Sequence, residues 1–193
     1  MERRSARSIF FDSTLSIFSC RKTDTLSHFP TLRSWQWYDR AKLADPQNID
    51  FSKYDRINYA FFQPNIDGNL YGTDSWGNPQ LLWGPYVTDP ALQSKSGANS
   101  NYFCSWDGPL GSDDDRNCNY HDIEKGLVFL AHKVGVEVMP SIGEWTLSTN
   151  FTTIAASDVK RQNFAKQCVD LIDAYGFDGI ESTPLSVHQC SRS

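Results

Sequence analysis

The residues of this sequence best suited to proton transfer are carboxylates at the end of a strand-like run. Residues 177–180 (Phe-Asp-Gly-Ile) follow an amphipathic helical pattern, and an acidic residue comes next. Side chains two residues apart on a strand share a face, so positions 181, 183 and 185 point the same way. These positions hold Glu181, Thr183 and Leu185. A general acid must approach its target to about 3 Å, and only the first of these side chains carries a carboxyl group.

Aromatic residues near the ends of two other strand-like runs are suited to binding sugars. Residues 57–62 (Ile-Asn-Tyr-Ala-Phe-Phe) form a dense β-branched and aromatic run, typical of a buried strand, and Phe61 lies near its end. Trp145 follows a second run within residues 141–146 (Ser-Ile-Gly-Glu-Trp-Thr). Flat apolar rings pack against the apolar faces of pyranose units.

Helical patterns precede the last two strands. The first predicted helix spans residues 121–134, and a strand is predicted at residues 136–141. The second helix is capped by Ser157 or Asp158 and ends at Gly176. Uniformly apolar strands that alternate with helices imply a parallel sheet covered by helices. The predicted apolar faces are Ile123, Leu127, Phe129, Leu130 and Val134 on the first helix, and Phe164, Cys168, Leu171, Ile172 and Tyr175 on the second.

The order and spacing of the three strand-like runs, with the helices between them, resemble the second, third and fourth strands of glycoside hydrolase family 18, the chitinase family. The resemblance implies a (β/α)8 TIM barrel with its site at the carboxyl ends of the strands. A complete barrel takes about 250 residues, so this α/β chain is expected to form a truncated barrel of about the first four β/α units. The predicted organisation is an unmatched extension at residues 1–32, a barrel segment at residues 33–180 and a divergent tail at residues 181–193.

The resemblance also implies roles for the fourth strand, which in the family carries Asp-Gly-x-Asp-x-Asp-x-Glu. The final Glu protonates the leaving oxygen, and the preceding Asp orients the N-acetyl group with which the substrate assists its own hydrolysis. Asp178 matches the first Asp and is expected to have only a supporting, structural role. Thr183 and Leu185 occupy the positions of the orienting Asp and the general acid. Glu181 lies roughly 13 Å along the strand from position 185, so no hydrolysis is predicted.

Residues 141–144 resemble the Ser-x-Gly-Gly of the family's third strand, with Glu144 in place of the second Gly. Glu144 is either a gatekeeping or merely variant side chain, which crowds the site, or a displaced acid. The expected partner is chitin or a chito-oligosaccharide. The resemblance implies no metal or organic cofactor, and the sequence has no evident metal-ligand cluster. The substrate-binding residues that the resemblance implies are Phe61, Trp145, and Trp35 and Trp37 from a first strand predicted at residues 34–38.

Charge and cysteine positions limit the partners and the compartment. The formal net charge of −5 argues against nucleic acid and anionic membranes as partners, and no apolar run is long enough to span a membrane. Cys104 and Cys118 form either a disulfide or a pair of free thiols in a reducing compartment. Cys168 is expected in the core. The family resemblance implies secretion, although residues 1–32 make a poor signal peptide.

Residues 63–120 are rich in Asn, Gly, Asp, Pro and Ser and are expected to form a long loop. A turn at residues 65–68 (Asn-Ile-Asp-Gly) predicts a short hairpin whose second arm is residues 69–71. The aromatic residues of this segment are expected to form a local apolar cluster rather than a sugar site. They are Tyr71, Trp76, Trp83, Tyr102 and Trp106.

Two other functions are compatible with the sequence. One is a non-catalytic carbohydrate-binding protein that keeps the aromatic residues. The other is a non-functional truncated product whose first and fourth strands leave sheet edges open to aggregation or self-association. The polar tail at residues 181–193 has no apolar periodicity. We interpret the tail as a frame change, a retained intron or a faulty gene model, with a natural short isoform as the alternative.

Overall fold

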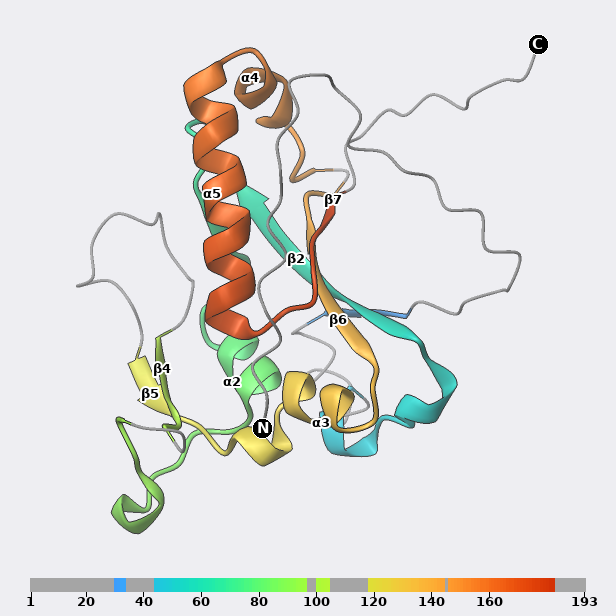
Figure 1. Ribbon diagram of the computed structural model, residues 1–193, viewed down its shortest axis with the longest axis vertical. Coiled ribbons are helices and arrows are strands. Elements are labelled where there is room, and N and C mark those ends of the chain that lie inside the picture. Colours follow the sequence, from blue (N-terminus) through green and yellow to red (C-terminus); the bar gives the residue numbers. More distant parts are fainter. Residues whose placement is uncertain (1–29, 34–43, 97–99, 105–117, 145, 183–193) are drawn as a thin grey trace.

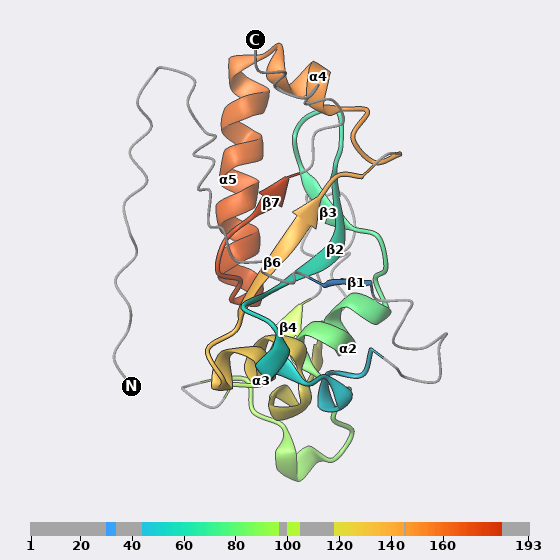
Figure 2. The ribbon, with the colours of Figure 1, turned by 90° about the vertical axis from the view of Figure 1, so that its right-hand side faces the viewer.

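A central sheet with helices on one face forms the framework of the computed structural model (Figures 1 and 2). The strand order is β1-β2-β6-β7, these four strands are parallel, and β3 pairs with β2. The strands are β1 (Thr31–Arg33), β2 (Arg56–Pro64), β3 (Leu70–Gly72), β6 (Glu137–Ile142) and β7 (Glu181–Ser182). The structure describes residues 30–33, 44–96, 100–104, 118–144 and 146–182.

The described residues form four α-helices beside the sheet. The longest, α5, runs along one face of the sheet, while α2 and α3 lie near the amino-terminal ends of β2 and β6 and α4 lies near their carboxyl ends (Figures 1 and 2). The predicted parallel α/β arrangement is therefore confirmed for the described residues. None of the helices described has the length and apolar character needed to cross a membrane. The helices are α2 (Gly77–Trp83), α3 (Leu127–Lys133), α4 (Phe151–Ala155) and α5 (Asp158–Tyr175).

The core lies between the helices and one face of the sheet. Ile57, Tyr59 and Phe62 on β2 are fully buried, as are Val138 and Ile142 on β6. The Tyr59 hydroxyl donates a 2.7 Å hydrogen bond to the Asn78 side chain on α2. Burying an apolar side chain such as Ile57 or Phe62 stabilises the fold by about 1.5–3 kcal/mol. The predicted buried strand at residues 57–62 is thus confirmed, and it extends to residues 56–64.

The hairpin predicted after β2 is confirmed. β3 pairs antiparallel with the end of β2, with Gln63 opposite Tyr71 and Pro64 opposite Leu70. The Asn65 side-chain oxygen accepts from the Asp67 and Asn69 backbone N–H groups and closes the turn.

The long loop expected at residues 63–120 contains more regular structure than the predicted hairpin. This segment holds α2 and an antiparallel pair of strands, β4 (Tyr102–Cys104) and β5 (Cys118–Tyr120). Every residue of α2 is buried, so tertiary packing stabilises a helix of seven residues that is too short to be stable alone. Cys104 and Cys118 form a disulfide across the β4–β5 pair, which decides between the two alternatives for these cysteines.

Trp83 belongs to the main core, rather than to a local cluster within the segment. Its ring stacks on Tyr175 of α5 at a centroid distance of 4.2 Å and on Phe103 of β4 at 4.7 Å. The stack therefore joins α2, α5 and the β4–β5 pair. Trp76, by contrast, is 51% exposed, and Trp106 lies outside the described residues.

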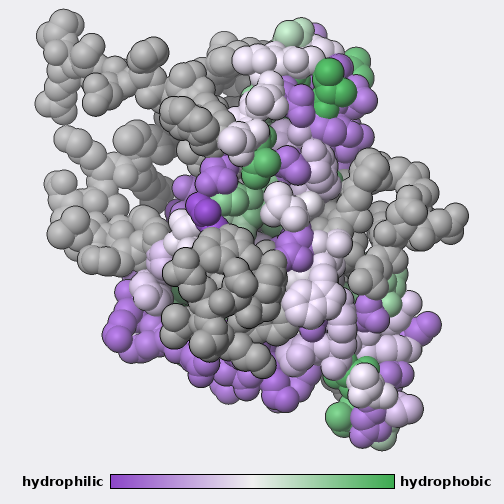
Figure 3. All heavy atoms as spheres, turned by 180° about the vertical axis from the view of Figure 1, so that it is seen from behind, coloured by the Kyte–Doolittle hydropathy of each residue, from purple (hydrophilic) through white to green (hydrophobic). Residues whose placement is uncertain are grey.

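The first predicted helix begins later than expected. A 3-10 turn at Ile123–Lys125 comes first, and α3 begins at Leu127 after Gly126, which has an extended conformation. As a result the apolar face is shifted: Val128 and Ala131 are buried with Leu127, whereas the predicted core residues Phe129 and Val134 are 40% and 60% exposed. On the face of the molecule that Figure 3 shows, hydrophobic residues lie in small separate groups.

The second predicted helix is confirmed at Asp158–Tyr175, with Gly176 in the left-handed conformation at its end. Leu171 and Tyr175 are buried as predicted, and Cys168 is a free thiol packed beside the core. The strand predicted at residues 136–141 is confirmed at Glu137–Ile142, whereas the strand expected to start at Phe177 begins at Glu181. The first strand predicted at residues 34–38 lies outside the described residues, and the described first strand is Thr31–Arg33.

We predict that Trp83→Ala lowers the free energy of unfolding by about 3–5 kcal/mol, because it leaves a large cavity between Tyr175 and Phe103. Trp76→Ala is the matched control and is expected to change it by at most about 0.5 kcal/mol, since that ring is half exposed. Urea unfolding followed by far-UV circular dichroism measures both. Equal losses in the two variants would contradict the central position of Trp83.

Candidate functional site

The carboxyl ends of the parallel strands bring charged and aromatic side chains to one edge of the sheet. Arg33 ends β1, Phe61 lies near the end of β2, and Glu144 follows β6 by two residues. In parallel α/β proteins, ligands bind at this edge because the loops that follow the strands converge there. The candidate site is built on these three residues.

One row of paired residues crosses all four parallel strands just below this edge. Arg33 is opposite Ala60, Ala60 is opposite Ser141, and Ser141 is opposite Glu181. Residues in one such row point to the same face of a sheet. The neighbouring row contains Tyr59, which packs on α2, so the Arg33–Glu181 row faces away from the helices. Its two middle residues are small, and both ends are charged.

Phe61 is half buried and lies next to this row. The guanidinium carbon of Arg33 lies 4.8 Å from the centroid of the Phe61 ring, within the range of a cation–π contact. The Thr73 hydroxyl donates a 3.1 Å hydrogen bond to the Phe61 carbonyl and ties β2 to the chain after β3. The Ala60–Phe61 peptide bond is cis, and the pairing of β2 with β6 shifts register between Ala60 and Phe62.

Glu144 is positioned by a tight turn that follows β6. Gly143 has a φ of 84°, and a Cβ atom at this residue would lie 2.7 Å from both the Phe151 ring and the Ser148 hydroxyl oxygen, so only glycine fits. The Leu147 N–H and the Ser148 hydroxyl both donate to the Glu144 carbonyl. The Glu144 carboxylate lies 3.0 Å from Arg33 Nη2.

Glu181 is partly buried at the end of the residue row. Burial raises the pKa of the Glu181 carboxyl group, and the positive charge of Arg56 lowers it to a lesser extent. Burial disfavours the charged form of a carboxyl group, which accounts for the direction of the shift. Asn58 and Met139 pair with each other two residues before the Ala60–Ser141 pair, so they lie on the same face of the sheet as Glu181.

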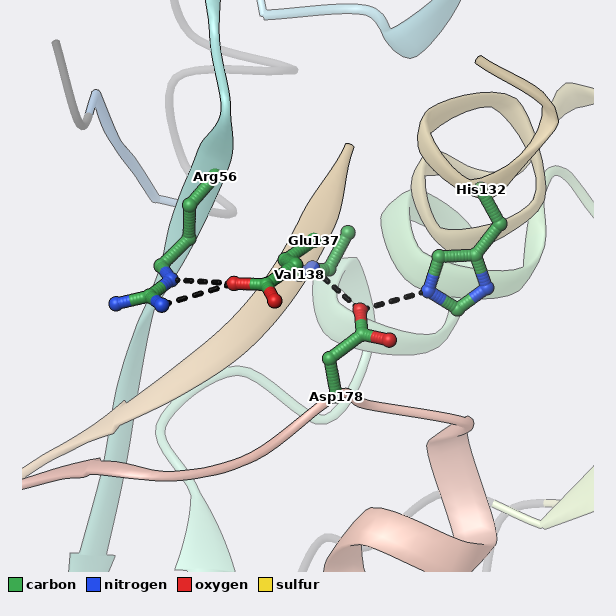
Figure 4. Close-up of polar contacts among 5 residues, drawn as sticks. All are labelled: Arg56, His132, Glu137, Val138 and Asp178. Atoms are coloured by element: carbon green, nitrogen blue, oxygen red, sulfur yellow. Dashed lines mark hydrogen bonds and ion pairs between the residues drawn. The ribbon is translucent and has the colours of Figure 1, made fainter. Parts of the chain in front are cut away.

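Asp178 lies away from the candidate site, toward the amino-terminal ends of the strands (Figure 4). Its Oδ2 atom accepts a 2.8 Å hydrogen bond from the Val138 N–H and lies 2.8 Å from Nε2 of His132 on α3. The Asp178 N–H also donates to the Val138 carbonyl. Beside it, Arg56 donates two hydrogen bonds to the Glu137 carboxylate. Asp178 therefore fastens the chain after α5 to β6 and α3.

Of the residues predicted to bind substrate, the structure describes only Phe61. Trp35, Trp37 and Trp145 lie outside the described residues. Arg33 is a site residue that sequence reasoning missed, because the first strand was expected to begin at Ser34, one residue after Arg33. Among the residues that the structure describes, no three His, Cys, Asp or Glu side chains gather closely enough to hold a metal ion.

Comparison with known proteins assigns the chain to a family. The sequence profile of the family described as "Glycosyl hydrolases family 18" matches residues 32–181. This chain belongs to glycosyl hydrolase family 18. Membership and the parallel strand order agree with a TIM-barrel-like α/β fold.

Similar proteins include Endochitinase 1 of Metarhizium anisopliae, which is 28% identical over 149 residues. That match covers 77% of this chain and 29% of the relative. Sporulation-specific chitinase 2 of Saccharomyces cerevisiae is 29% identical over 154 residues, which cover 77% of this chain and 27% of the relative. The chain thus spans less than a third of the length of these curated relatives.

Solved structures that match this chain include a chitinase from Rhizomucor miehei and the Group IV chitinase of Ostrinia furnacalis. The first has 24% identity and a TM-score of 0.44, and the match covers 79% of this chain and 31% of that chain. The second has 19% identity and a TM-score of 0.47, with the same two coverages of 79% and 31%.

We predict that Asp178→Ala lowers the free energy of unfolding by about 1–3 kcal/mol, because the Val138 N–H loses its side-chain acceptor. Asp178→Asn keeps a carbonyl oxygen that can accept from the Val138 N–H, so its free energy of unfolding is expected to fall by less. Urea unfolding of the two variants measures the difference. If both variants unfolded at the wild-type midpoint, the proposed fastening of the chain to β6 would be wrong.

We also predict a pH dependence from Glu181. Its pKa is raised by burial, so its contribution to stability is present at acidic pH and is lost as pH rises through the folded-state pKa. Glu181→Gln cannot ionise, and its stability relative to the wild type is therefore expected to increase from acidic to neutral pH. Paired urea titrations across this range measure the trend. A constant or falling difference would contradict the burial of this carboxyl group.

Proposed function

We propose that this chain is the amino-terminal part of a chitinase-like barrel, which binds chitin or chito-oligosaccharides at the carboxyl edge of its strands and does not hydrolyse them. The match to glycosyl hydrolase family 18 over residues 32–181 supports the polysaccharide class. The parallel order of β1, β2, β6 and β7 supports about the first four β/α units of the barrel. Its net charge of −5 leaves a neutral polymer as a suitable partner.

The position of Phe61 is the observation that supports binding most directly. The ring is half buried at the end of a central parallel strand, where a family-18 site is expected. An aromatic face that is open enough to touch a ligand and fixed enough to stay in place gives a sugar ring a stacking surface at low entropic cost. We assign the same role to Trp145, Trp35 and Trp37, on the family resemblance alone.

The absence of hydrolysis follows from the residues at the acid positions. Leu185 occupies the general-acid position of the family motif, and a leucine side chain has no proton to give. Glu181 pairs with Ser141 on β6. Glu181 lies four residues before position 185, which holds the acid in the family. That separation corresponds to roughly 13 Å, whereas proton transfer requires about 3 Å.

Glu144 is the other carboxylate near the edge, and its interactions disfavour a role as a displaced acid. Its carboxylate forms an ion pair with Arg33 at 3.0 Å. The ion pair directs this carboxylate oxygen at the guanidinium group of Arg33 rather than at a ligand. Glu144 is therefore better suited to shaping the site than to catalysis.

The purified chain is expected to be retained on chitin beads and to release no chromophore from a chromogenic chito-oligosaccharide. Phe61→Ala is expected to bind roughly fivefold more weakly, because one aromatic contact is worth about 1 kcal/mol. Phe129→Ala, which changes an exposed ring on α3, is the matched control and is expected to bind like the wild type. Bead depletion isotherms measure the affinities.

Two outcomes would contradict the proposal. Sugar release that is abolished by Glu144→Gln or Glu181→Gln would show that one of these carboxylates acts as the acid. Loss of all binding, together with aggregation, would favour a non-functional product instead. In the described sheet, β1 and β7 are the edge strands, and unprotected edges promote self-association. Size-exclusion chromatography distinguishes a soluble binding monomer from such assemblies.

A further inference from the structure

An ion pair lies over the ring that is best placed to stack on a sugar. Arg33 Nη2 is 3.0 Å from Glu144 Oε1, and the guanidinium carbon of Arg33 is 4.8 Å from the centroid of the Phe61 ring. We refer to this pair as the Arg33–Glu144 bridge. It joins residues 111 positions apart in the sequence, from the ends of the first and third parallel strands in chain order.

Backbone contacts fix both ends of the bridge. Arg33 is held by pairing with Ala60, which directly precedes Phe61. Glu144 is held by the turn after β6, where its carbonyl accepts two hydrogen bonds and Gly143 has little free space. Since β2 lies between β1 and β6, the two side chains reach toward each other across the end of β2. The guanidinium group is therefore held over Phe61 by geometry as well as by attraction.

The bridge occupies a surface that a neutral sugar would need. A pyranose that stacks on an aromatic ring uses the flat face of the ring, and the Arg33 guanidinium group lies over that ring. The two cannot occupy the same face at the same time. The bridge is also solvent accessible, with the Arg33 and Glu144 side chains 37% and 36% exposed. Exposed ion pairs are weak and are screened by salt, so a ligand is able to displace this one.

We propose that Glu144 is a specificity-determining residue that holds Arg33 over Phe61 and so weakens the binding of neutral chito-oligosaccharides. This inference rests on the proposed function and adds a charge-dependent control of the same site. Without the Glu144 carboxylate, Arg33 loses the ion pair that draws its guanidinium group across the end of β2, and the group leaves the ring face more readily when a ligand competes for it. The stacking surface of Phe61 then becomes available to the sugar.

The test compares the wild type with Glu144→Gly and Glu144→Gln, using a fluorescently labelled neutral chitotetraose and fluorescence anisotropy. At low salt both variants are expected to bind about three- to tenfold more tightly than the wild type, and tenfold corresponds to about 1.4 kcal/mol. The wild-type affinity is expected to approach that of the variants in roughly 0.5 M NaCl, where charges are screened within a few ångströms. The variants themselves are expected to respond little to salt.

Asp50→Asn is the matched control. Asp50 forms an exposed ion pair with Lys53, 3.1 Å away, in the short turn before the amino-terminal end of β2. The substitution removes one negative charge, as Glu144→Gln does, at the opposite end of the strand from Phe61. It is expected to leave chitotetraose binding unchanged. An affinity gain equal to that of Glu144→Gln would attribute the effect to net charge and overturn the inference.

The remaining outcomes separate the inference from the proposed function. If the wild type binds chitotetraose and both Glu144 variants bind it with the same affinity, the inference is overturned and the proposed function stands. If neither the wild type nor any variant binds chitotetraose, both the inference and the proposed function are overturned. NMR gives an independent readout, because the ring current of Phe61 shifts the Arg33 Nε–H resonance. That resonance is expected to move in both Phe61→Leu and Glu144→Gln, and an unchanged resonance in both would overturn the bridge itself.

Discussion

The parallel pairing of β2 with β6 is the constraint on which the rest of this structure depends. Its register places Ala60 opposite Ser141 and so aligns a row of residues from Arg33 to Glu181 across four strands. The other face of the same pair buries Tyr59, Phe62 and Val138 under the helices. A one-residue slip would exchange the two faces, which would expose the core and bury the charged ends of the row. Packing and site geometry are therefore fixed by the same interaction.

Charged groups lie at both ends of this sheet, at a structural end and at the end that holds the candidate site. At the amino-terminal end, Asp178 accepts hydrogen bonds that join the chain after α5 to β6, and Arg56 pairs with Glu137. At the carboxyl end, the Arg33–Glu144 bridge lies over Phe61. Under the function proposed above, a family-18 chain with leucine at the general-acid position binds a polymer without protonating its glycosidic oxygen, so groups that control access to the aromatic ring set its affinity.

Sequence alone predicted the elements whose signals are local. The apolar runs of β2 and β6 and the periodic face of α5, ended by Gly176, were all recognisable without tertiary information. Helix α2 was not, because its seven residues are too few to be stable alone and its stability comes from burial against Tyr59 and Tyr175. The Arg33–Glu144 bridge joins residues 111 positions apart, so no sequence window contains it. Phe61 was predicted as a site residue, whereas the cation over its ring was not.

The most direct test of the account is an NMR titration of the isotopically labelled chain with neutral chitotetraose. We expect chemical-shift changes to concentrate at Arg33, Phe61 and Glu144, to be small at Asp178 and His132, and to leave the tetrasaccharide intact throughout. Shift changes centred on Asp178, or the appearance of shorter oligosaccharides during the titration, would contradict a binding edge that lacks a proton donor.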